Sequence, residues 1–238
     1  MKRSLQCVDA RVTLSIIVPC LNEAEGVAAA LDALGPLRRR GAEVIVVDGG
    51  STDGTAAIAA DRADVILASP RGRAVQMNAG ASRARGDVLL FLHADTRLPE
   101  DADALIAEDL ARSGASWGRF DVTIRGRNPL LRVVAAAMNL RSRWTGIATG
   151  DQAIFVTREA FGRVGGYPGI ALMEDIALSA KLRAIGAPVC IAQRASTSGR
   201  RWEKHGVVRT VVLMWRLRLA YYFGADPDKL APRYAADK

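Results

Sequence analysis

Short apolar runs rich in Val, Ile and Leu alternate with alanine-rich segments through the first hundred residues. The apolar runs have the length of strands buried on both faces, and they cover 13–19, 43–48, 64–68 and 87–95. The segments between them have apolar residues at helical spacing, begin near Asn, Asp or Gly, and cover 23–34, 53–61 and 73–85. This alternation predicts an α/β fold with a doubly wound, mostly parallel sheet.

After residue 114 the alternation becomes looser. We expect further strands at 115–124, 153–157 and 188–192, and helices at 129–143, 174–185 and 207–223. The chain has 238 residues and no internal repeat or low-complexity linker, which fits one globular domain. We divide that domain into a first half at 12–112, a second half at 113–205, and a basic amphipathic helix with a tail at 206–238.

Composition narrows the choice of partners. A formal charge of +8 predicts a surface that attracts anions, such as nucleic acid, acidic lipid headgroups or phosphorylated small molecules. Cys7, Cys20 and Cys190 are widely spaced and form no CxxC pair, which is typical of reduced thiols in a cytoplasmic protein. The N-terminal apolar stretch is too short for a secretory signal, and arginines interrupt the late apolar segment at 207–223, so we expect no membrane span.

Polar side chains follow three of the predicted strands, at the edge where doubly wound sheets bind ligands. Asn22 and Glu23 follow the first strand, Asp48 and Ser51 follow the second, and Asp95 follows the fourth. A helix cap would explain Asn22, and a turn would explain Ser51 or an isolated Asp95. Convergence of three strand ends on one crevice favours a binding site over these separate local roles.

The residue types at this edge suit a phosphorylated ligand and a cation. Arg71 and Arg73 precede a helix that contains Asn78, a suitable fringe for a diphosphate or nucleoside, although a solvated basic loop is the alternative. Asp95 suits Mg²⁺ or Mn²⁺, because these cations often take one or two protein oxygens and complete their shell with substrate phosphates and water.

Glu174 and Asp175 begin a later helix, where the helix dipole stabilises anions and where capping is the simpler interpretation. Adjacent helical residues point in different directions, so we expect one carboxylate to face the crevice and the other to support it. Mutual repulsion would raise the pKa of one of them toward that of a general base.

Five motifs together, SIIVPCLNE, VVDGGSTDGT, HAD, GDQA and MED, make residues 12 to 205 similar to the family 2 glycosyltransferases of the GT-A fold. The resemblance implies a Rossmann-like sheet whose first half binds a nucleoside diphosphate sugar, with a UDP-sugar the foremost choice, and whose second half binds a hydroxyl acceptor. It implies an inverting transfer assisted by Mn²⁺ or Mg²⁺. Several of the motifs also resemble a short bacterial subgroup associated with arsenosugar biosynthesis.

The resemblance and the strand-end pattern together assign the candidate site. Asp175 is the general base beside Glu174, and Asp95 is the metal ligand. His205 is a second metal ligand, because His93 stands where many relatives carry another carboxylate. The nucleotide sugar would contact Pro19, Asn22, Glu23, Asp48, Ser51, Arg71, Arg73, Asn78 and Ala94. The acceptor or diphosphate would contact Gly150, Asp151, Gln152, Arg200, Arg201 and Trp202.

One departure from the family bears on the reaction, and two other functions stay open. Ser198 stands where processive synthases carry Gln before Arg-Trp, so we expect a single transfer. A sugar-phosphate nucleotidyltransferase would need a GxGTR-like loop after the first strand, where PCLNEAEG stands instead. A nucleic-acid or membrane-surface binder would use the last helix, whose apolar positions 207, 208, 211, 212, 215, 219 and 222 form one stripe. We expect no nucleic acid partner, and leave open a peripheral contact with the inner face of the cell membrane.

Overall fold

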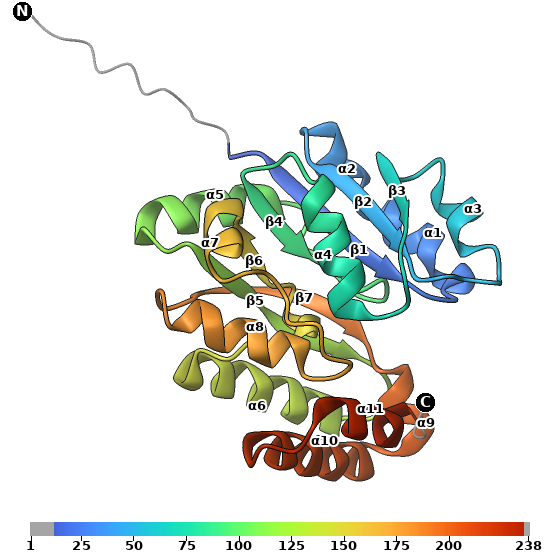
Figure 1. The fold of residues 1–238 in the computed structure, drawn as a ribbon, viewed down its shortest axis with the longest axis vertical. Coiled ribbons are helices and arrows are strands. Elements are labelled where there is room, and N and C mark those ends of the chain that lie inside the picture. Colours follow the sequence, from blue (N-terminus) through green and yellow to red (C-terminus); the bar gives the residue numbers. More distant parts are fainter. Residues whose placement is uncertain (1–11, 236–238) are drawn as a thin grey trace, which may run out of the picture.

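The computed structural model describes residues 12–235 and contains a seven-stranded sheet with helices on both faces (Figure 1). The strand order is β3-β2-β1-β4-β6-β5-β7. The strands are β1 (Leu14–Cys20), β2 (Glu43–Asp48), β3 (Val65–Ala68), β4 (Val88–Phe91), β5 (Trp117–Arg125), β6 (Phe155–Thr157) and β7 (Val189–Ser198). The first four strands pair in parallel, and so do β5 and β7, whereas β6 runs antiparallel to β4 and β5. The predicted doubly wound, mostly parallel sheet is confirmed, and β6 joins the two expected halves in one sheet.

Alternate side chains of the buried strands pack on helices at opposite faces. Ile16 and its neighbours pack on α1 (Ala24–Asp32), α2 (Gly35–Arg39), α3 (Thr55–Ala59) and α5 (Ala102–Ser113). Ile17 and its neighbours pack on α4 (Arg73–Arg83), α7 (Arg158–Arg163) and α8 (Glu174–Arg183), and Figure 1 shows α4 and α8 in front of the sheet. Burial of both faces explains why these strands are continuous Val, Ile and Leu runs without polar alternation.

The last elements are α9 (Arg200–His205), α10 (Val207–Tyr222) and α11 (Pro227–Ala235), at the lower end of the molecule in Figure 1. They follow β7, and two of them, α9 and α10, pack on α6 (Leu130–Thr145); the 3₁₀ turn η1 (Gly150–Gln152) lies earlier in the chain. Leu217 of α10 and Leu230 of α11 pack on Leu172 and Met173, directly before α8. No helix within residues 12–235 is both long enough and apolar enough to cross a membrane.

Several elements differ from the sequence prediction. The helix α5 was missed, although Ala102, Ile106 and Leu110 bury one face at a spacing of four residues. The predicted strand at 87–95 ends at Phe91, because the HAD motif leaves the sheet. The predicted strand at 188–192 continues to Ser198 as the partner of β5, past an irregularity in register between Phe120 and Asp121.

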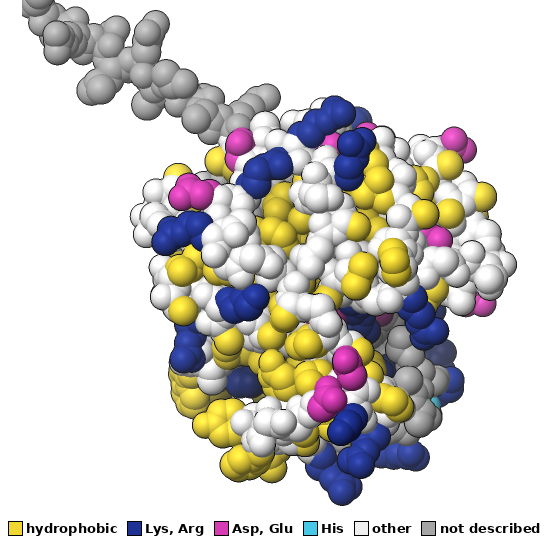
Figure 2. All heavy atoms as spheres, viewed as in Figure 1, with side chains coloured by type: hydrophobic (Ala, Val, Ile, Leu, Met, Phe, Trp, Pro, Cys, Tyr) yellow, Lys and Arg dark blue, Asp and Glu magenta, His cyan; other side chains and the backbone are white. Residues whose placement is uncertain are grey.

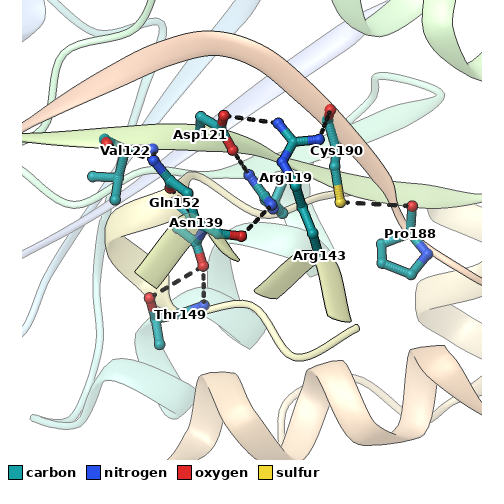
Figure 3. A network of polar contacts seen from close by, with 9 residues as sticks. All are labelled: Arg119, Asp121, Val122, Asn139, Arg143, Thr149, Gln152, Pro188 and Cys190. Carbon is teal, nitrogen blue, oxygen red and sulfur yellow. Dashed lines mark hydrogen bonds and ion pairs between the residues drawn. The ribbon is translucent and has the colours of Figure 1, made fainter. Parts of the chain in front are cut away.

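A buried polar network fixes η1 against β5 and α6 (Figure 3). The Arg119 guanidinium, which is fully buried, pairs with Asp121, and Arg143 donates to the second Asp121 oxygen at 2.7 Å. Asn139 accepts from the backbone N–H of Val122 at 2.8 Å and donates to its carbonyl at 3.0 Å. Every charged member has a partner, so the network holds α6 to the sheet without leaving a buried charge unpaired.

The two cysteines in the described part of the chain, Cys20 and Cys190, are free. Burial, together with the carboxylates of Glu23 and Asp48, raises the pKa of the Cys20 thiol to about 12. Since the thiolate is the reactive form, Cys20 is an inert core residue. Cys7 lies outside the described residues.

Candidate active site

A cleft opens where the strand order reverses at β1. β1 lies between β2 and β4, and the Ile17 carbonyl accepts from Leu92 N at 2.9 Å. Because alternate residues of a strand face the same neighbour, Pro19 faces the side on which β4 has already ended. Pro lacks an N–H, and here no ladder bond is lost. The HAD motif is thereby free to diverge from β1 at the position where doubly wound sheets bind ligands.

The cleft has a volume of about 160 Å³ and gathers residues that follow three different strands. Glu23 follows β1, Ala94 and Asp95 follow β4, and Arg200 follows β7. Arg200 also lies 3.6 Å from a carboxylate oxygen of Glu23. Residues from three separate motifs of the sequence therefore line one cleft.

The loops after β1 and β2 are bonded to each other. Asn22 N donates to Ser51 Oγ at 2.9 Å, and Asn22 Oδ1 accepts from Thr52 N at 2.9 Å. Asp53 bonds to two helices: its Oδ2 accepts from Ala24 N at 3.0 Å at the start of α1, and its Oδ1 accepts from Thr55 N at 3.0 Å at the start of α3. These bonds hold Asn22 in a left-handed conformation with a φ of 53° and make the two loops one rigid rim.

Asp48 has one carboxylate oxygen without a partner. Its Oδ2 accepts from Gly50 N at 3.1 Å and Ser51 N at 3.0 Å, whereas its buried Oδ1 has no hydrogen bond within residues 12–235. Asp48 is the register partner of Cys20, so it lies at the same sheet edge as the cleft. A buried acceptor without a partner requires explanation, and a ligand N–H would supply the missing bond.

Asp95 has the chemistry of a ligand for a hard cation. It is half-buried, lines the cleft, and its Oδ1 lies 3.4 Å from the Thr96 hydroxyl, which is long for a hydrogen bond. Within residues 12–235, no three His, Cys, Asp or Glu side chains gather closely enough to hold a metal ion. The donor set therefore fits Mg²⁺ or Mn²⁺, which accept a single carboxylate when phosphate and water complete the shell.

Three motifs meet around His93 and Gly150. The His93 Nδ1 lies 3.4 Å from Asp151 Oδ1, and the His93 ring packs on Gly150, where a Cβ atom would come within 2.3 Å of Nε2. The Gly150 N–H donates to Asp175 Oδ2 at 2.9 Å. The HAD, GDQA and MED motifs are therefore joined in one chain of contacts, although Gly150 lies 57 residues after His93 and 25 residues before Asp175.

The two adjacent carboxylates of α8 have different surroundings, as the sequence predicts. Glu174 is buried and lies 3.5 Å from Arg73, whereas Asp175 is partly exposed. Burial and the neighbouring Asp175 charge raise the pKa of Glu174 against the opposing effect of Arg73. The raised pKa thus falls on Glu174, the buried member of the pair.

Other predicted residues lie near the site but are engaged elsewhere. Both polar groups of the Asn78 side chain bond to the Tyr167 backbone, at 2.9 and 3.0 Å. Gln152 is fully buried and its amide serves Thr149 and Asn139, at 3.2 and 3.4 Å. Trp202 packs on the hydrophobic cluster between α6 and α10. We therefore assign these three residues to positioning the site.

Three further predicted residues do not line the cleft that contains Asp95. Arg71 is exposed at the entry to α4. The Arg201 guanidinium lies 3.6 Å from the ring centroid of Tyr234 and donates to its carbonyl at 3.0 Å. His205 shares α9 with Arg200 but does not line the cleft that contains Asp95. We leave His205 out of the metal site.

Two arginines that the sequence did not single out face the catalytic motifs. Arg141 of α6 and Arg218 of α10 have buried guanidinium nitrogens without a partner within residues 12–235. Burial lowers the pKa of both groups, each is within electrostatic reach of Asp175, and Arg141 also feels the charge of Arg218. Only the packing of α6 and α10 brings them together, so the local sequence gave no signal for them.

The sheet, the switch-point cleft and the three joined motifs define a protein of the GT-A glycosyltransferase class. Residues 15–167 match the family model described as "Glycosyl transferase family 2". The chain belongs to glycosyl transferase family 2.

The relatives and solved structures agree with this membership. The chain is 29% identical over 201 residues to the succinoglycan biosynthesis protein ExoA of Rhizobium meliloti, covering 76% of this chain and 61% of that protein. It is 34% identical over 173 residues to a PGL/p-HBAD biosynthesis glycosyltransferase of Mycobacterium bovis, covering 64% and 62%. The chain thus spans about three fifths of the length of these relatives.

Two solved structures share the fold. TarS of S. aureus in complex with UDP-GlcNAc superposes with a TM-score of 0.63 at 17% identity, covering 78% of this chain and 58% of that chain. The mannosyltransferase PcManGT of Pyrobaculum calidifontis, in complex with GDP-Man and Mn²⁺, gives a TM-score of 0.61 at 25% identity, covering 87% and 60%. The GT-A fold expected from the sequence is confirmed.

Proposed function

We propose that this protein is an inverting glycosyltransferase that moves one sugar from a nucleoside diphosphate sugar to an acceptor hydroxyl. The observation that carries this function is the contact of Asp175 with Gly150, beside His93 and Asp151 and on the same sheet edge as Asp95. A UDP-sugar is the first donor to test, since TarS has the same fold and binds UDP-GlcNAc. Arsenosugar precursors, which the subgroup resemblance implies, are the first acceptors to test.

Asp175 is placed to act as the base. Its two oxygens accept from Gly150 N at 2.9 Å and from Ile176 N at 2.7 Å, which fixes the carboxylate plane. In the proposed step the acceptor O–H gives its proton to Asp175, and its oxygen bonds to the anomeric carbon of the sugar. The bond from that carbon to the diphosphate oxygen breaks, and its electron pair leaves with the nucleoside diphosphate.

Positive charge around the cleft would stabilise the leaving group. Arg97, Arg125 and Arg200 line the same cleft as Asp95. A divalent cation held by Asp95 would supply further charge stabilisation on the diphosphate. Asp48 Oδ1 would accept from the nucleobase, because it is the buried oxygen without a partner at the neighbouring strand end.

The division of labour along the chain follows from these positions. We assign the nucleotide sugar to 12–112, the acceptor to 113–205, and a separate surface role to 206–238. Asp48 and Asp95 belong to the first part and Asp175 to the second, and the contacts of Gly150 with His93 and Asp175 support a site shared by both parts. We place the reaction in the cytoplasm, in keeping with the free thiols of Cys20 and Cys190.

A thermal unfolding series tests the assignment. UDP with Mn²⁺ should raise the unfolding temperature of the wild-type protein, and EDTA should abolish the shift. Asp95→Ala should lose the shift, Asp175→Asn should keep it, and the exposed Asp61→Asn should behave as wild type. If no nucleoside diphosphate gives a shift with any divalent metal, while duplex DNA gives a salt-sensitive one, the protein is a nucleic-acid binder instead.

A further inference from the structure

The α10 helix carries a continuous stripe of exposed apolar side chains. Val208, Val212, Trp215, Leu219 and Tyr222 recur every three or four residues and are 66%, 50%, 72%, 58% and 82% exposed. The single stripe expected from the sequence is in fact divided, because Val207 and Val211 turn inward against α6. Isolated exposed apolar residues are ordinary, but a helical stripe with two large aromatic side chains marks an interaction surface.

The neighbouring helix α6 presents a second stripe. Leu130, Val133, Leu140 and Trp144 are exposed along one side of this helix. Val134 and Met138 of α6 pack in the same cluster as Val207 and Val211 of α10, so the two helices lie side by side. Figure 2 shows hydrophobic side chains gathered over this lower part of the molecule. We refer to the exposed residues of both stripes as the apolar face.

A basic groove borders the apolar face. It lies between α10 and α11, has a volume of about 660 Å³, and includes Val212, which also belongs to the stripe. Arg209, Arg216 and Arg233 line it, and its other lining residues are apolar: Leu213, Leu217, Ala220 and Leu230. An apolar floor beneath several guanidinium groups matches a molecule with a phosphate at one end and hydrocarbon at the other.

We propose that the apolar face docks on an anionic lipid bilayer and that the groove binds a lipid phosphate. Trp, Tyr and Leu side chains are those that amphipathic helices insert at the headgroup boundary, and arginines beside them are attracted by anionic lipids. The net charge of +8 adds a long-range attraction. A second copy of the chain is the poorer occupant, because a two-fold contact would place the groove arginines of both copies together. Membrane docking does not depend on the catalytic step.

Vesicle sedimentation tests the docking surface. The protein should pellet with vesicles of phosphatidylcholine and phosphatidylglycerol at 4:1 (chosen as about one anionic lipid in five), and weakly with phosphatidylcholine alone. Added salt should weaken the binding. Trp215→Ala with Leu219→Ala should lower the affinity at least about tenfold by removing buried apolar area. Arg216→Gln with Arg233→Gln should remove the preference for anionic lipid.

Matched controls are available on other surfaces. Ile66→Ala and Arg83→Gln change exposed side chains on β3 and α4, away from the apolar face, and should bind vesicles as wild type does. All the substituted side chains are exposed, so the unfolding temperatures of the variants should match and a folding defect can be recognised.

Three outcomes would overturn membrane docking. The first is the absence of binding to any vesicle. The second is equal binding by the double variants and the controls. The third is a dimer in light scattering that Trp215→Ala with Leu219→Ala returns to a monomer, which would make a second copy the occupant. If inorganic phosphate raises the unfolding temperature while no vesicle is bound, the first outcome holds, and the phosphate in the groove is not that of a lipid.

Discussion

The imidazole Nδ1 of His93 lies 3.4 Å from a carboxylate oxygen of Asp151, in the wall of the site. Burial alone would lower the pKa of His93, but the hydrogen bond and charge of Asp151, with Asp95, raise it on balance. Burial in turn opposes ionisation of Asp151, and the bond to His93 holds its pKa below the ordinary value. The protonated imidazole of His93 and the carboxylate of Asp151 therefore stabilise each other's charged forms.

The titration of His93 should show this pairing directly. The sequence has two histidines, so a His205→Gln variant leaves His93 as the single imidazole signal in NMR. Its pKa should lie above the ordinary 6.5, and Asp151→Asn should lower it, because only the charge of Asp95 then opposes burial and Arg73. An unchanged pKa in the Asp151→Asn protein would show that the two groups do not interact.

The same pair predicts how stability depends on pH. A raised pKa in the folded protein means that the His93 contribution is fully present below about pH 6.5 and is lost as pH rises through the folded pKa. The pKa of Asp151 is lowered in the folded protein, so the contribution of Asp151 to the free energy of unfolding is lost as the pH falls through that folded pKa. The free energy of unfolding in urea should therefore differ more between wild type and Asp151→Asn at pH 5 to 6, below the ordinary pKa of 6.5, than at pH values above the folded pKa of His93. A difference that grows steadily with pH would contradict the pairing.

Gly150 is required by the packing of the His93 ring. In Gly150→Ala the new Cβ would come within 2.3 Å of His93 Nε2, so the ring or η1 must move. We expect a loss of about 1–3 kcal/mol in the free energy of unfolding and a lower kcat, since the Gly150 N–H also orients Asp175. Gly162→Ala is the matched control, because a Cβ there meets nothing within 4 Å and the site lies inside α7. Urea unfolding of both variants checks the difference.

The sequence predicted the sheet edge well because its strands are buried on both faces. Runs such as 44–47 have no polar position, and the ends of the strands are marked by Asp48 or by the HAD motif. The helix α5 has an equally regular buried spacing and has Asp101 at its start, which is typical of a helix N-terminus, so both signals for it were present in the sequence. Boundaries moved wherever a tertiary contact ended or extended an element, as in β7, which lengthens against β5.

The roles of individual side chains were harder to predict. Asn78 had the residue type of a ligand contact, yet its partner is the backbone of Tyr167, 89 residues away. Ser51 and Asn22 are bonded to each other's loops in the same way. Arg141 and Arg218 stand on separate helices whose packing no local pattern specifies. Spacing along the chain identifies the motifs, but pairing between distant loops decides which polar atoms remain available.

The buried Arg119 makes Asp121 essential to folding. In Asp121→Ala the fully buried Arg119 guanidinium would lose its carboxylate, and so would Arg143. Leaving a buried charge without a partner should lower the free energy of unfolding by about 3–5 kcal/mol. Asp32→Ala removes an exposed ion pair with Arg62 and should change the free energy of unfolding by less than about 1 kcal/mol. Equal effects in urea unfolding would mean that Arg119 is solvated.

The division of roles between Asp175 and Glu174 can be separated by kinetics. An Asn side chain at 175 can still accept from Gly150 N but cannot take a proton, so Asp175→Asn should lower kcat by about 10²–10⁴-fold with little change in donor KM. Glu174 instead holds Arg73, so Glu174→Gln should weaken that contact and raise donor KM more than it lowers kcat. If Glu174→Gln abolishes kcat while Asp175→Asn retains it, Glu174 is the base. In that case the pKa of Glu174, raised by burial and by Asp175, would set the pH at which the reaction begins.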